Sequence, residues 1–337
     1  MKQHKLGQSE LLVSPLTIGC WSFGGGQDSY WGRQEQVDVN QLVQTALDQG
    51  VNFFDTAFGY NDGRSEASLG QALAGRRQEA VICNKIPIQS YDELKQYDQT
   101  ISDSLKRLQT DYVDLMMIHW PTKDQDLLQA NLEAMQKQKE KGNIRYIGVS
   151  NFATQTLEIA HNMGIEIIAD EFVYNLMSRG IERDVLPYCC DHNIGVVAYM
   201  PLMQGVLAGK YKRIDDIPPI RRRTIHFDQE HNPLVRHGGS GYETLLVRML
   251  EQMRDLAIES GYAEDRLAIA WLMTKPGVSS VIAGCRNVKQ LQDNAVSVET
   301  SLSSETVERL DEISEPLRQK MGNNLDIWQL GDNSRIW

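Results

Sequence analysis

The chain has 337 residues and a formal net charge of −11 at pH 7. This acidic surplus excludes nucleic acid as the main partner, because phosphate binding requires clustered Lys and Arg. The one dense basic cluster, at residues 221–223, is predicted to be a solvated loop. No run approaches the ~20 apolar residues of a membrane helix, and no long apolar stretch follows the N-terminus. We therefore expect a cytoplasmic protein that does not bind membranes.

The cysteines give no sign of a disulfide framework or a metal site. They are Cys20, Cys83, Cys189, Cys190 and Cys285. Their number is odd, and no two of them form a CxxC pair. We predict reduced, mostly buried thiols and no bound metal.

The chain alternates between short apolar runs and helical patterns. Two β-like pieces within residues 4–18 predict a small hairpin ahead of the main fold. The strands that follow are expected at residues 16–21, 51–55, 80–85, 113–119, 144–150, 167–170, 194–199 and 278–282. The helices are expected at residues 34–49, 66–73, 91–108, 127–141, 154–163, 181–192, 242–260, 266–274, 288–294 and 304–317. The long irregular segment 213–241 is expected to be a functional lid or a binding loop.

Eight buried strands alternating with helices, without a break in composition, predict a (β/α)8 TIM barrel of the α/β class. We expect a single domain over residues 1–337, with the hairpin at its start and extra helices and loops on its C-terminal side. A doubly wound sheet is the structural alternative. It is weakened because Gly24-Gly25-Gly26, after the first strand, lacks the GxGxxG spacing of a dinucleotide-binding loop.

Polar and aromatic side chains stand where the apolar runs end, which in such a barrel is where catalytic groups lie. They are Trp21, Asp55, Lys85, His119, Ser150, Asn151, Glu171 and Tyr199, with Tyr60 five residues beyond Asp55. Taken singly, each has an ordinary structural explanation, such as a helix-capping Asp or a packing Tyr. Four titratable groups from neighbouring strands and one loop make a joint accident improbable.

The chemistry that these groups suggest is proton transfer by Tyr60. A free phenol has a pKa of about 10, and a neighbouring ammonium such as that of Lys85 stabilises the phenolate and eases proton loss. Asp55 would hold Lys85 charged and correctly aimed. His119 would donate a hydrogen bond to a substrate carbonyl oxygen. The predicted catalytic residues are therefore Asp55, Tyr60, Lys85 and His119.

Along nearly its whole length the chain resembles an aldo-keto reductase. The segment Asp55-Thr56-Ala57-x-x-Tyr60, followed by Gly63-x-Ser65-Glu66 and Leu69-Gly70, is similar to the signature around that family's catalytic tyrosine. Lys85 and His119-Trp120-Pro121 also stand where the family requires them. The resemblance implies hydride transfer between nicotinamide C4 and a carbonyl carbon, with Tyr60 protonating the alkoxide.

The resemblance also implies a set of cofactor-binding residues. Ser150 and Asn151 match the pair that holds the nicotinamide carboxamide, and Tyr199 matches the tyrosine that stacks on the ring. The stretch expected to cradle the pyrophosphate contains Pro201, Leu202, Gly205, Leu207, Gly209 and Lys210, and the adenosine end is expected at Gly284, Arg286, Gln290 and Asn294. Arg286 suits a 2′-phosphate and favours NADP(H). Gln290 is neutral where many members have a second basic residue, so NAD(H) stays open.

Two positions depart from the family pattern. Glu171, also expected at the cofactor, stands where the family commonly has Gln, and Met200 stands where Ser usually follows the stacking tyrosine. A carboxylate accepts a hydrogen bond from the carboxamide but cannot donate one unless protonated. We expect its charge to favour the oxidised, cationic nicotinamide and alcohol oxidation.

Aromatic residues are expected to line the substrate side: Trp21, Phe58 and Trp120. They indicate a small carbonyl or alcohol compound without identifying it, and the sequence does not indicate the oligomeric state. Two other functions stay open: a Schiff-base lyase or aldolase that uses Lys85, and a non-catalytic nicotinamide-binding redox sensor or regulatory subunit.

Overall fold

Eight parallel strands form a closed barrel in the order β10-β3-β4-β5-β6-β7-β8-β9 in the computed structural model, which describes residues 1–337. The barrel strands are β3 (Leu16–Gly19), β4 (Phe53–Asp55), β5 (Val81–Ile86), β6 (Val113–Ile118), β7 (Ile144–Ser150), β8 (Ile167–Val173), β9 (Gly195–Tyr199) and β10 (Val278–Gly284). Each barrel strand after β3 follows at least one helix, with the longest connection between β9 and β10, and neighbouring strands pair in parallel. The predicted (β/α)8 barrel is confirmed.

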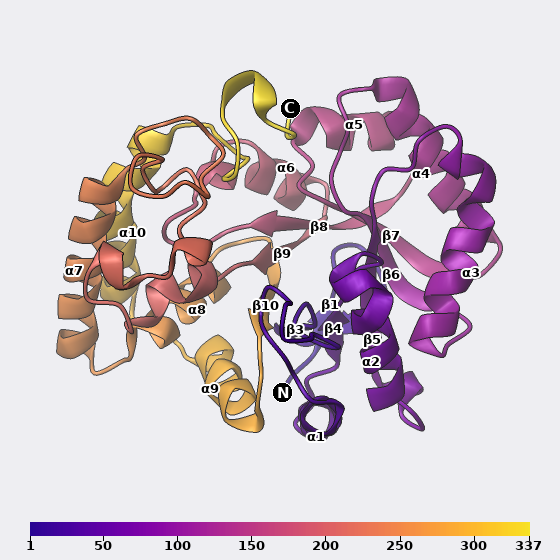
Figure 1. Ribbon diagram of the computed structural model, residues 1–337, viewed down its shortest axis with the longest axis horizontal. Helices are drawn as coiled ribbons and strands as arrows, with labels where there is room; N and C mark the ends of the chain where they lie inside the picture. The colour runs from indigo at the N-terminus through magenta and orange to yellow at the C-terminus, as the bar shows by residue number, and fades with distance from the viewer.

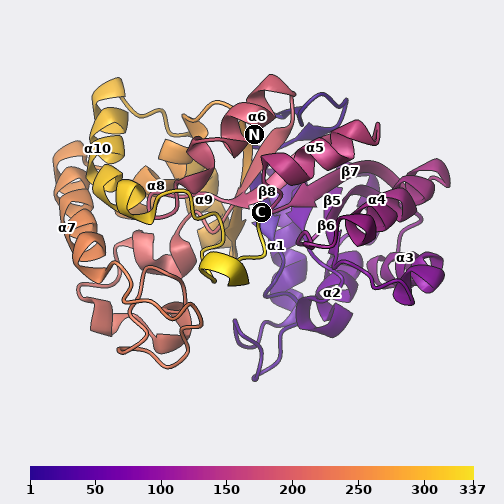
Figure 2. The same ribbon diagram turned by 90° about the horizontal axis from the view of Figure 1, so that it is seen from above.

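Helices surround the strands, as Figures 1 and 2 show, with α7 and α10 on one side of the barrel and α3 and α4 on the other. They are α1 (Gln36–Asp48), α2 (Arg64–Ala72), α3 (Tyr97–Leu108), α4 (Gln125–Glu140), α5 (Thr154–Asn162), α6 (Val185–Asp191), α7 (Glu243–Ser260), α8 (Glu264–Met273), α9 (Val288–Glu299) and α10 (Ser304–Met321). None of them combines the length and the apolar composition that crossing a bilayer demands.

The predicted hairpin is present as two antiparallel strands, β1 (His4–Lys5) and β2 (Leu12–Val13). Leu6, Leu11 and Val13 from the hairpin join a cluster of 12 buried residues that includes Phe53 and Leu115 from the barrel strands. Since these strand residues precede the polar strand ends, the hairpin and the cluster close the amino-terminal end of the barrel with apolar side chains. Asp55, Lys85 and Glu171 lie towards the opposite end.

The end of the sixth barrel strand and the start of the third helix differ from the expected boundaries. The sixth strand does not stop at Asp170 but continues through Val173, so Glu171 lies inside β8. Consecutive acidic residues indicate a strand end when water must solvate them, but here both carboxylates are buried. The helix expected over 91–108 begins as a short 3-10 helix, η3 (Glu93–Gln96), before α3.

The expectation that residues 221–223 form a solvated loop is wrong. Arg222 is buried, and the guanidinium carbon of Arg221 lies 3.9 Å from the centre of the Trp31 ring. Arg223 lies 5.0 Å from the ring centre of Tyr30, which Arg221 also contacts. Arginine stacks on aromatic faces because its charge is spread over a plane and is weakly hydrated.

The segment 213–241 is anchored by specific hydrogen bonds. The buried ring of His226 has its Nε2 2.9 Å from the carbonyl oxygen of Met177. The amide of Ile225 donates to the carbonyl oxygen of Ile327 in the C-terminal tail, at 2.8 Å. The segment is therefore an ordered connection between β9 and α7 that packs on the C-terminal tail.

We expect Gly70→Ala to destabilise the protein by about 1–3 kcal/mol, because overpacking a close helix contact forces the backbone apart. A Cβ on Gly70 in α2 would lie 2.5 Å from the carbonyl oxygen of Leu108 at the end of α3. Urea unfolding measures the change. Gly26→Ala is the control, since nothing lies within 4 Å of a Cβ there. Equal midpoints for the two variants would contradict the close contact.

Candidate active site

The ammonium of Lys85 lies at the centre of the polar end of the barrel. Its side chain on β5 is fully buried. Its Nζ donates to Asp55 Oδ1 and, at 3.1 Å, to the carbonyl oxygen of Thr56, and it lies 3.2 Å from Glu171 Oε2. Burial alone would disfavour the charged form, but Asp55 and then Glu171 outweigh it and raise the pKa of Lys85 well above its ordinary value. Lys85 is therefore a cation near pH 7.

Tyr60 stands directly beside this cation. It opens the short 3-10 helix η1 (Tyr60–Gly63), and its ring centre lies 5.4 Å from Lys85 Nζ. Asn61, in a left-handed conformation with φ 49°, holds the turn by donating to the carbonyl oxygens of Trp21 and Phe23 at 2.9 and 2.8 Å. Asn adopts this backbone region more readily than most residues. The loop thereby holds the Tyr60 ring beside Lys85.

The acidity of Tyr60 differs from the expectation. Burial raises its pKa, and the ammonium of Lys85 lowers it only in part, so the net pKa lies above the ordinary value. The predicted effect of Lys85 has the right sign, but the predicted net easing of proton loss is wrong. The phenol is neutral near pH 7, which suits a proton donor.

His119 follows β6, and its ring centre lies 5.7 Å from that of Tyr60 in an edge-on arrangement. Its amide donates to the carbonyl oxygen of Ile86 at 2.8 Å. Burial, followed by the positive charges of Lys85 and Arg335, lowers the pKa of His119 to about 3. The imidazole is therefore neutral and can act as a hydrogen-bond donor rather than as an acid.

The residues expected at the nicotinamide lie on the neighbouring strands β7 to β9. Asn151 adopts φ 64° directly after β7, and its Nδ2 donates to Ser150 Oγ at 2.9 Å. The hydroxyl of Tyr199 at the end of β9 donates to Asn151 Oδ1 at 2.8 Å. Ser150 also pairs with Glu171 across the sheet. The structure thus brings these four residues together beside Lys85.

The stretch expected at the pyrophosphate leaves β9 as the 3-10 segment η5 (Met203–Ala208) and forms tight turns. Pro201, Leu202 and Leu207 pack within it, and Gly209 ends it in a left-handed conformation. Gly205 has φ +93°, and a Cβ there would lie 2.7 Å from the Nζ of Lys210. Lys210 itself is exposed. Met200, the second departure, turns the chain with φ 56°, and its carbonyl oxygen accepts from Asn175 Nδ2 at 3.0 Å.

The residues expected at the adenosine end lie after β10. Gly284 is exposed at the strand end, and the exposed guanidinium of Arg286 donates to the carbonyl oxygens of Trp31, at 2.7 Å, and Arg33. Gln290 accepts from the Arg286 amide at 2.8 Å, while Asn294 is buried and donates to Cys285 Sγ. Arg286 keeps further N–H donors for an anion.

Two of the three residues expected at the substrate border the mouth. Trp21 stacks on Tyr60 with ring centres 5.6 Å apart, and Trp120 directly follows His119. The third, Phe58, lies against the guanidinium of Arg107 on α3, 4.6 Å from its carbon. Its ring is thus engaged on the side of the helices.

Sequence reasoning did not find three aromatic and basic groups at this mouth. Tyr30 stacks on Trp21 with ring centres 5.0 Å apart, and its hydroxyl donates to Gln204 Oε1 at 2.6 Å. Arg335 from the C-terminal tail lies 3.6 Å from the ring centre of Trp120 and forms two hydrogen bonds with the carboxylate of Asp326. Trp328 from the same tail lies under Arg223. Loop and tail residues carry no periodicity that would have indicated these contacts.

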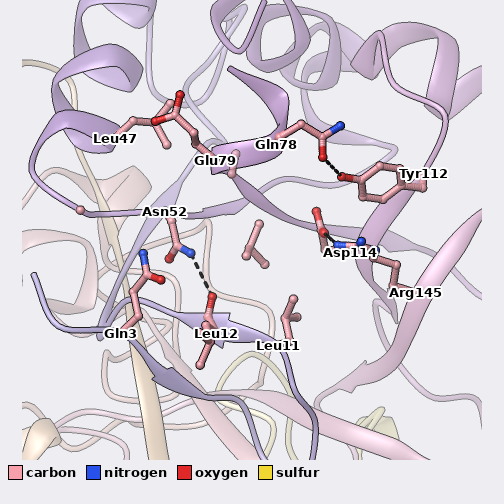
Figure 3. Close-up of a pocket in the computed structure, with 13 residues that line it drawn as sticks. Gln3, Leu11, Leu12, Leu47, Asn52, Gln78, Glu79, Tyr112, Asp114 and Arg145 are labelled. Carbon is pink, nitrogen blue, oxygen red and sulfur yellow. Dashed lines mark hydrogen bonds and ion pairs between the residues drawn. The ribbon is translucent and has the colours of Figure 1, made fainter. Parts of the chain in front are cut away.

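A hollow of about 440 Å³ lies at the amino-terminal end of the barrel, away from the candidate active site (Figure 3). Its lining comes from the hairpin and the starts of the strands, including Leu12, Asn52 and Tyr112. Asp114 there accepts from Arg77 and Arg145, and Asn52 donates to the carbonyl oxygen of Leu12. These polar groups already have partners, so we assign the hollow a structural role.

With this geometry established, comparison with known proteins identifies the family. Residues 15–315 match the family model described as Aldo/keto reductase family. The chain belongs to this family. It is therefore an oxidoreductase that uses a nicotinamide cofactor, as the sequence predicted.

Individual relatives cover almost the whole chain. A probable voltage-gated potassium channel subunit beta of Arabidopsis thaliana is 32% identical, over 94% of this chain and 98% of that protein. An NADH-specific methylglyoxal reductase of Escherichia coli (strain K12) is 28% identical, over 95% of this chain and all of that protein. The crystal structure of an aldo-keto reductase from Klebsiella pneumoniae in complex with NADPH has a TM-score of 0.72 at 26% identity, over 96% of this chain and 98% of that one.

The residues present fit the nicotinamide group of the family's cofactor. Glu171 Oε2 is buried and accepts no hydrogen bond, although the ammonium of Lys85 lies 3.2 Å away. Beside it stand the hydroxyl of Ser150, the amide of Asn151 and the ring of Tyr199. An orphaned acceptor next to amide and hydroxyl groups suits a carboxamide, which both donates and accepts.

We expect the imidazole of His119 to remain neutral between about pH 5 and 8 because of its lowered pKa. Its ring NMR shifts should stay constant over that range. His231, whose pKa is raised by the hydrogen bond to Glu243, should titrate and serves as the internal control. The His119→Gln spectrum identifies the resonance. A His119 midpoint near its ordinary value would show that the ring is not enclosed as described.

Proposed function

We propose that the protein transfers hydride between the nicotinamide of NAD(P)(H) and a small carbonyl or alcohol compound, with Tyr60 as the proton donor and acceptor. The observation that supports this most directly is the placement of Tyr60 between the buried Lys85–Asp55 pair and neutral His119. The group of Ser150, Asn151, Glu171 and Tyr199 lies on the next strands of the same barrel end.

Each side chain has a distinct part in this reaction. The bound dinucleotide supplies or accepts the hydride. His119 donates a hydrogen bond to the carbonyl oxygen, which orients it and polarises the bond. The neutral phenol of Tyr60 gives its proton to the oxygen as negative charge develops there. Lys85 stabilises the resulting phenolate, and Asp55 keeps the ammonium charged and in place.

The geometry counts against the two alternative functions. A Schiff base requires a neutral amine as nucleophile, whereas the raised pKa of Lys85 beside Asp55 keeps it an ammonium. A purely regulatory role is suggested by the name of the plant potassium channel relative. The complete set of proton-transferring groups in this chain favours an enzyme instead.

We propose NADP(H) as the preferred cofactor, with NAD(H) as the second choice. The exposed guanidinium of Arg286 beside the end of β10 supports a 2′-phosphate, and a structural neighbour is in complex with NADPH. The neutral Gln290 and the NADH-specific relative support NADH.

The aromatic walls and the name of the NADH-specific relative make methylglyoxal and other small aldehydes the first substrates to test. Five free cysteines suit a cytoplasmic location.

Tyr60→Phe should lower kcat by about 10²–10⁴-fold, the usual contribution of a general acid. Its dissociation constant for NADPH should stay unchanged, because the lost hydroxyl donates a proton and does not hold the cofactor. NADPH absorbance with an aldehyde panel measures turnover, and NADPH fluorescence measures binding. Near-normal turnover in the variant would refute the assignment of Tyr60.

Arg286→Gln should raise the dissociation constant for NADPH by about tenfold to a hundredfold, the effect of losing hydrogen bonds between charged groups. The variant's affinity for NADH is the control, because loosening the bonds to Trp31 and Arg33 would affect both cofactors equally. Fluorescence titration measures both constants. Equal weakening of NADPH and NADH binding would assign Arg286 to the loop rather than to the phosphate.

A further inference from the structure

Two carboxylates share one ammonium at the base of the candidate site. Oxygens of Asp55 and Glu171 and the Sγ of Cys83 all lie within 4.8 Å of one another. Lys85 Nζ contacts both carboxylates and is the one cation among them. If both acids were ionised, the buried group would carry a net charge of minus one. Two like charges this close in a water-poor site do not both ionise readily.

Glu171 is the member of the pair suited to hold a proton. Asp55 accepts a hydrogen bond from Lys85, whereas Glu171 Oε2 lies 3.2 Å from the same ammonium without accepting one, and its residue is 4% exposed. Burial, and then the charge of Asp55, raises the pKa of Glu171 to about 8, against the opposing effect of Lys85. The buried acid therefore keeps its proton well above the pH at which an ordinary glutamate ionises.

The titratable groups around Glu171 come from four elements. They are Asp55 on β4, Cys83 and Lys85 on β5, Tyr60 on η1 and Tyr199 on β9, with Asp170 next to it on β8. Burial raises the pKa of Cys83, Tyr60 and Tyr199, so these three are neutral. Asp55 and Lys85 carry opposite charges that cancel. Burial also raises the pKa of Asp170, but Asp170 does not contact Lys85. Glu171 is therefore the group beside Lys85 whose ionisation sets the net charge.

We infer that Glu171 is a proton reservoir: it is a carboxylic acid when the bound nicotinamide is reduced and neutral, and a carboxylate when the nicotinamide is oxidised and cationic. This inference rests on the proposed function. It also replaces the expected preference for alcohol oxidation by a coupling that works in both directions. A Gln at this position can hold a carboxamide but cannot release a proton.

The proton transfers balance over one carbonyl reduction. The hydride brings an electron pair that forms the new C–H bond, the C=O π bond breaks, and Tyr60 gives its proton to the oxygen. Lys85 returns a proton to the phenolate, and Glu171 returns one to Lys85. The net change is one proton from Glu171 and one hydride from the cofactor to the substrate. The new carboxylate would offset the positive charge of an oxidised nicotinamide, so the net charge of the site with its cofactor would be zero before and after.

The inference predicts a proton released when the oxidised cofactor binds. As the pH is raised towards about 8, the affinity for NADP+ should increase by up to about tenfold per pH unit. Above about pH 8 it should level off, as linkage to one ionisation requires. The affinity for NADPH should not show this rise. Glu171→Gln should abolish the proton release and flatten the NADP+ profile.

Isothermal titration calorimetry in two buffers of different ionisation enthalpy measures the protons released on binding. Asp170→Asn is the matched control, because it removes a neighbouring buried carboxylate on the same strand that does not contact Lys85. The wild type and Asp170→Asn should release a proton on binding NADP+, and Glu171→Gln should not. No release by the wild type, or equal release by Glu171→Gln, would overturn the inference.

Unfolding without cofactor gives a second measurement. Because the folded pKa of Glu171 is raised, its contribution to stability is fully present below its unfolded pKa and is lost as pH rises through about 8. The urea midpoint of the wild type should therefore fall relative to that of Glu171→Gln as the pH rises from the unfolded pKa of a glutamate to about 8. Parallel profiles would count against a protonated Glu171.

Turnover and proton release test the proposed reaction and the role of Glu171 separately. Carbonyl turnover without proton release would refute the reservoir and leave the reductase intact. Proton release by a wild type that turns over no carbonyl compound would refute the proposed reaction and support the linkage between Glu171 and the cofactor's charge.

Discussion

The buried ammonium of Lys85 is the constraint on which the rest of the site depends. A lone buried charge costs several kcal/mol after relaxation, so the barrel must supply opposite charge at close range. Asp55 at the end of β4 supplies that charge, and Glu171 on β8 places a second carboxyl group 3.2 Å from the ammonium on the other side of β5. The closed sheet holds all three at fixed positions. Tyr60 and His119 then receive their protonation states from the same burial and the same cation.

Much of the fold was predictable because the signal was local. Each barrel strand is an apolar run whose length suits a strand, and each run ends in a polar residue or a turn. Asp55, Lys85 and His119 stood out because they closed such runs, and a barrel brings the ends of its strands to one mouth. Glu171 was found for the same reason, although β8 continues past it to Val173.

The remainder depends on contacts between distant segments. The residues 221–223 form a basic run in the sequence, and only the folded chain places Tyr30, Trp31 and Trp328 against them. The return of the C-terminal tail that lays Arg335 on Trp120 has no local signature either. The net pKa of Tyr60 is set by the balance of burial against Lys85. The sequence predicts that burial and Lys85 act on this pKa, but it does not predict which effect is larger.

The apolar floor of the barrel has a consequence for the electrostatics above it. Leu6, Leu11 and Val13 pack apolar side chains below the charged cluster, and the candidate site opens at the opposite mouth. A ligand seated in that mouth completes the enclosure and lowers the effective dielectric constant around Lys85. Every charge interaction in the cluster then strengthens at the moment of binding. The electrostatic field of the cluster is therefore strongest when a ligand is bound.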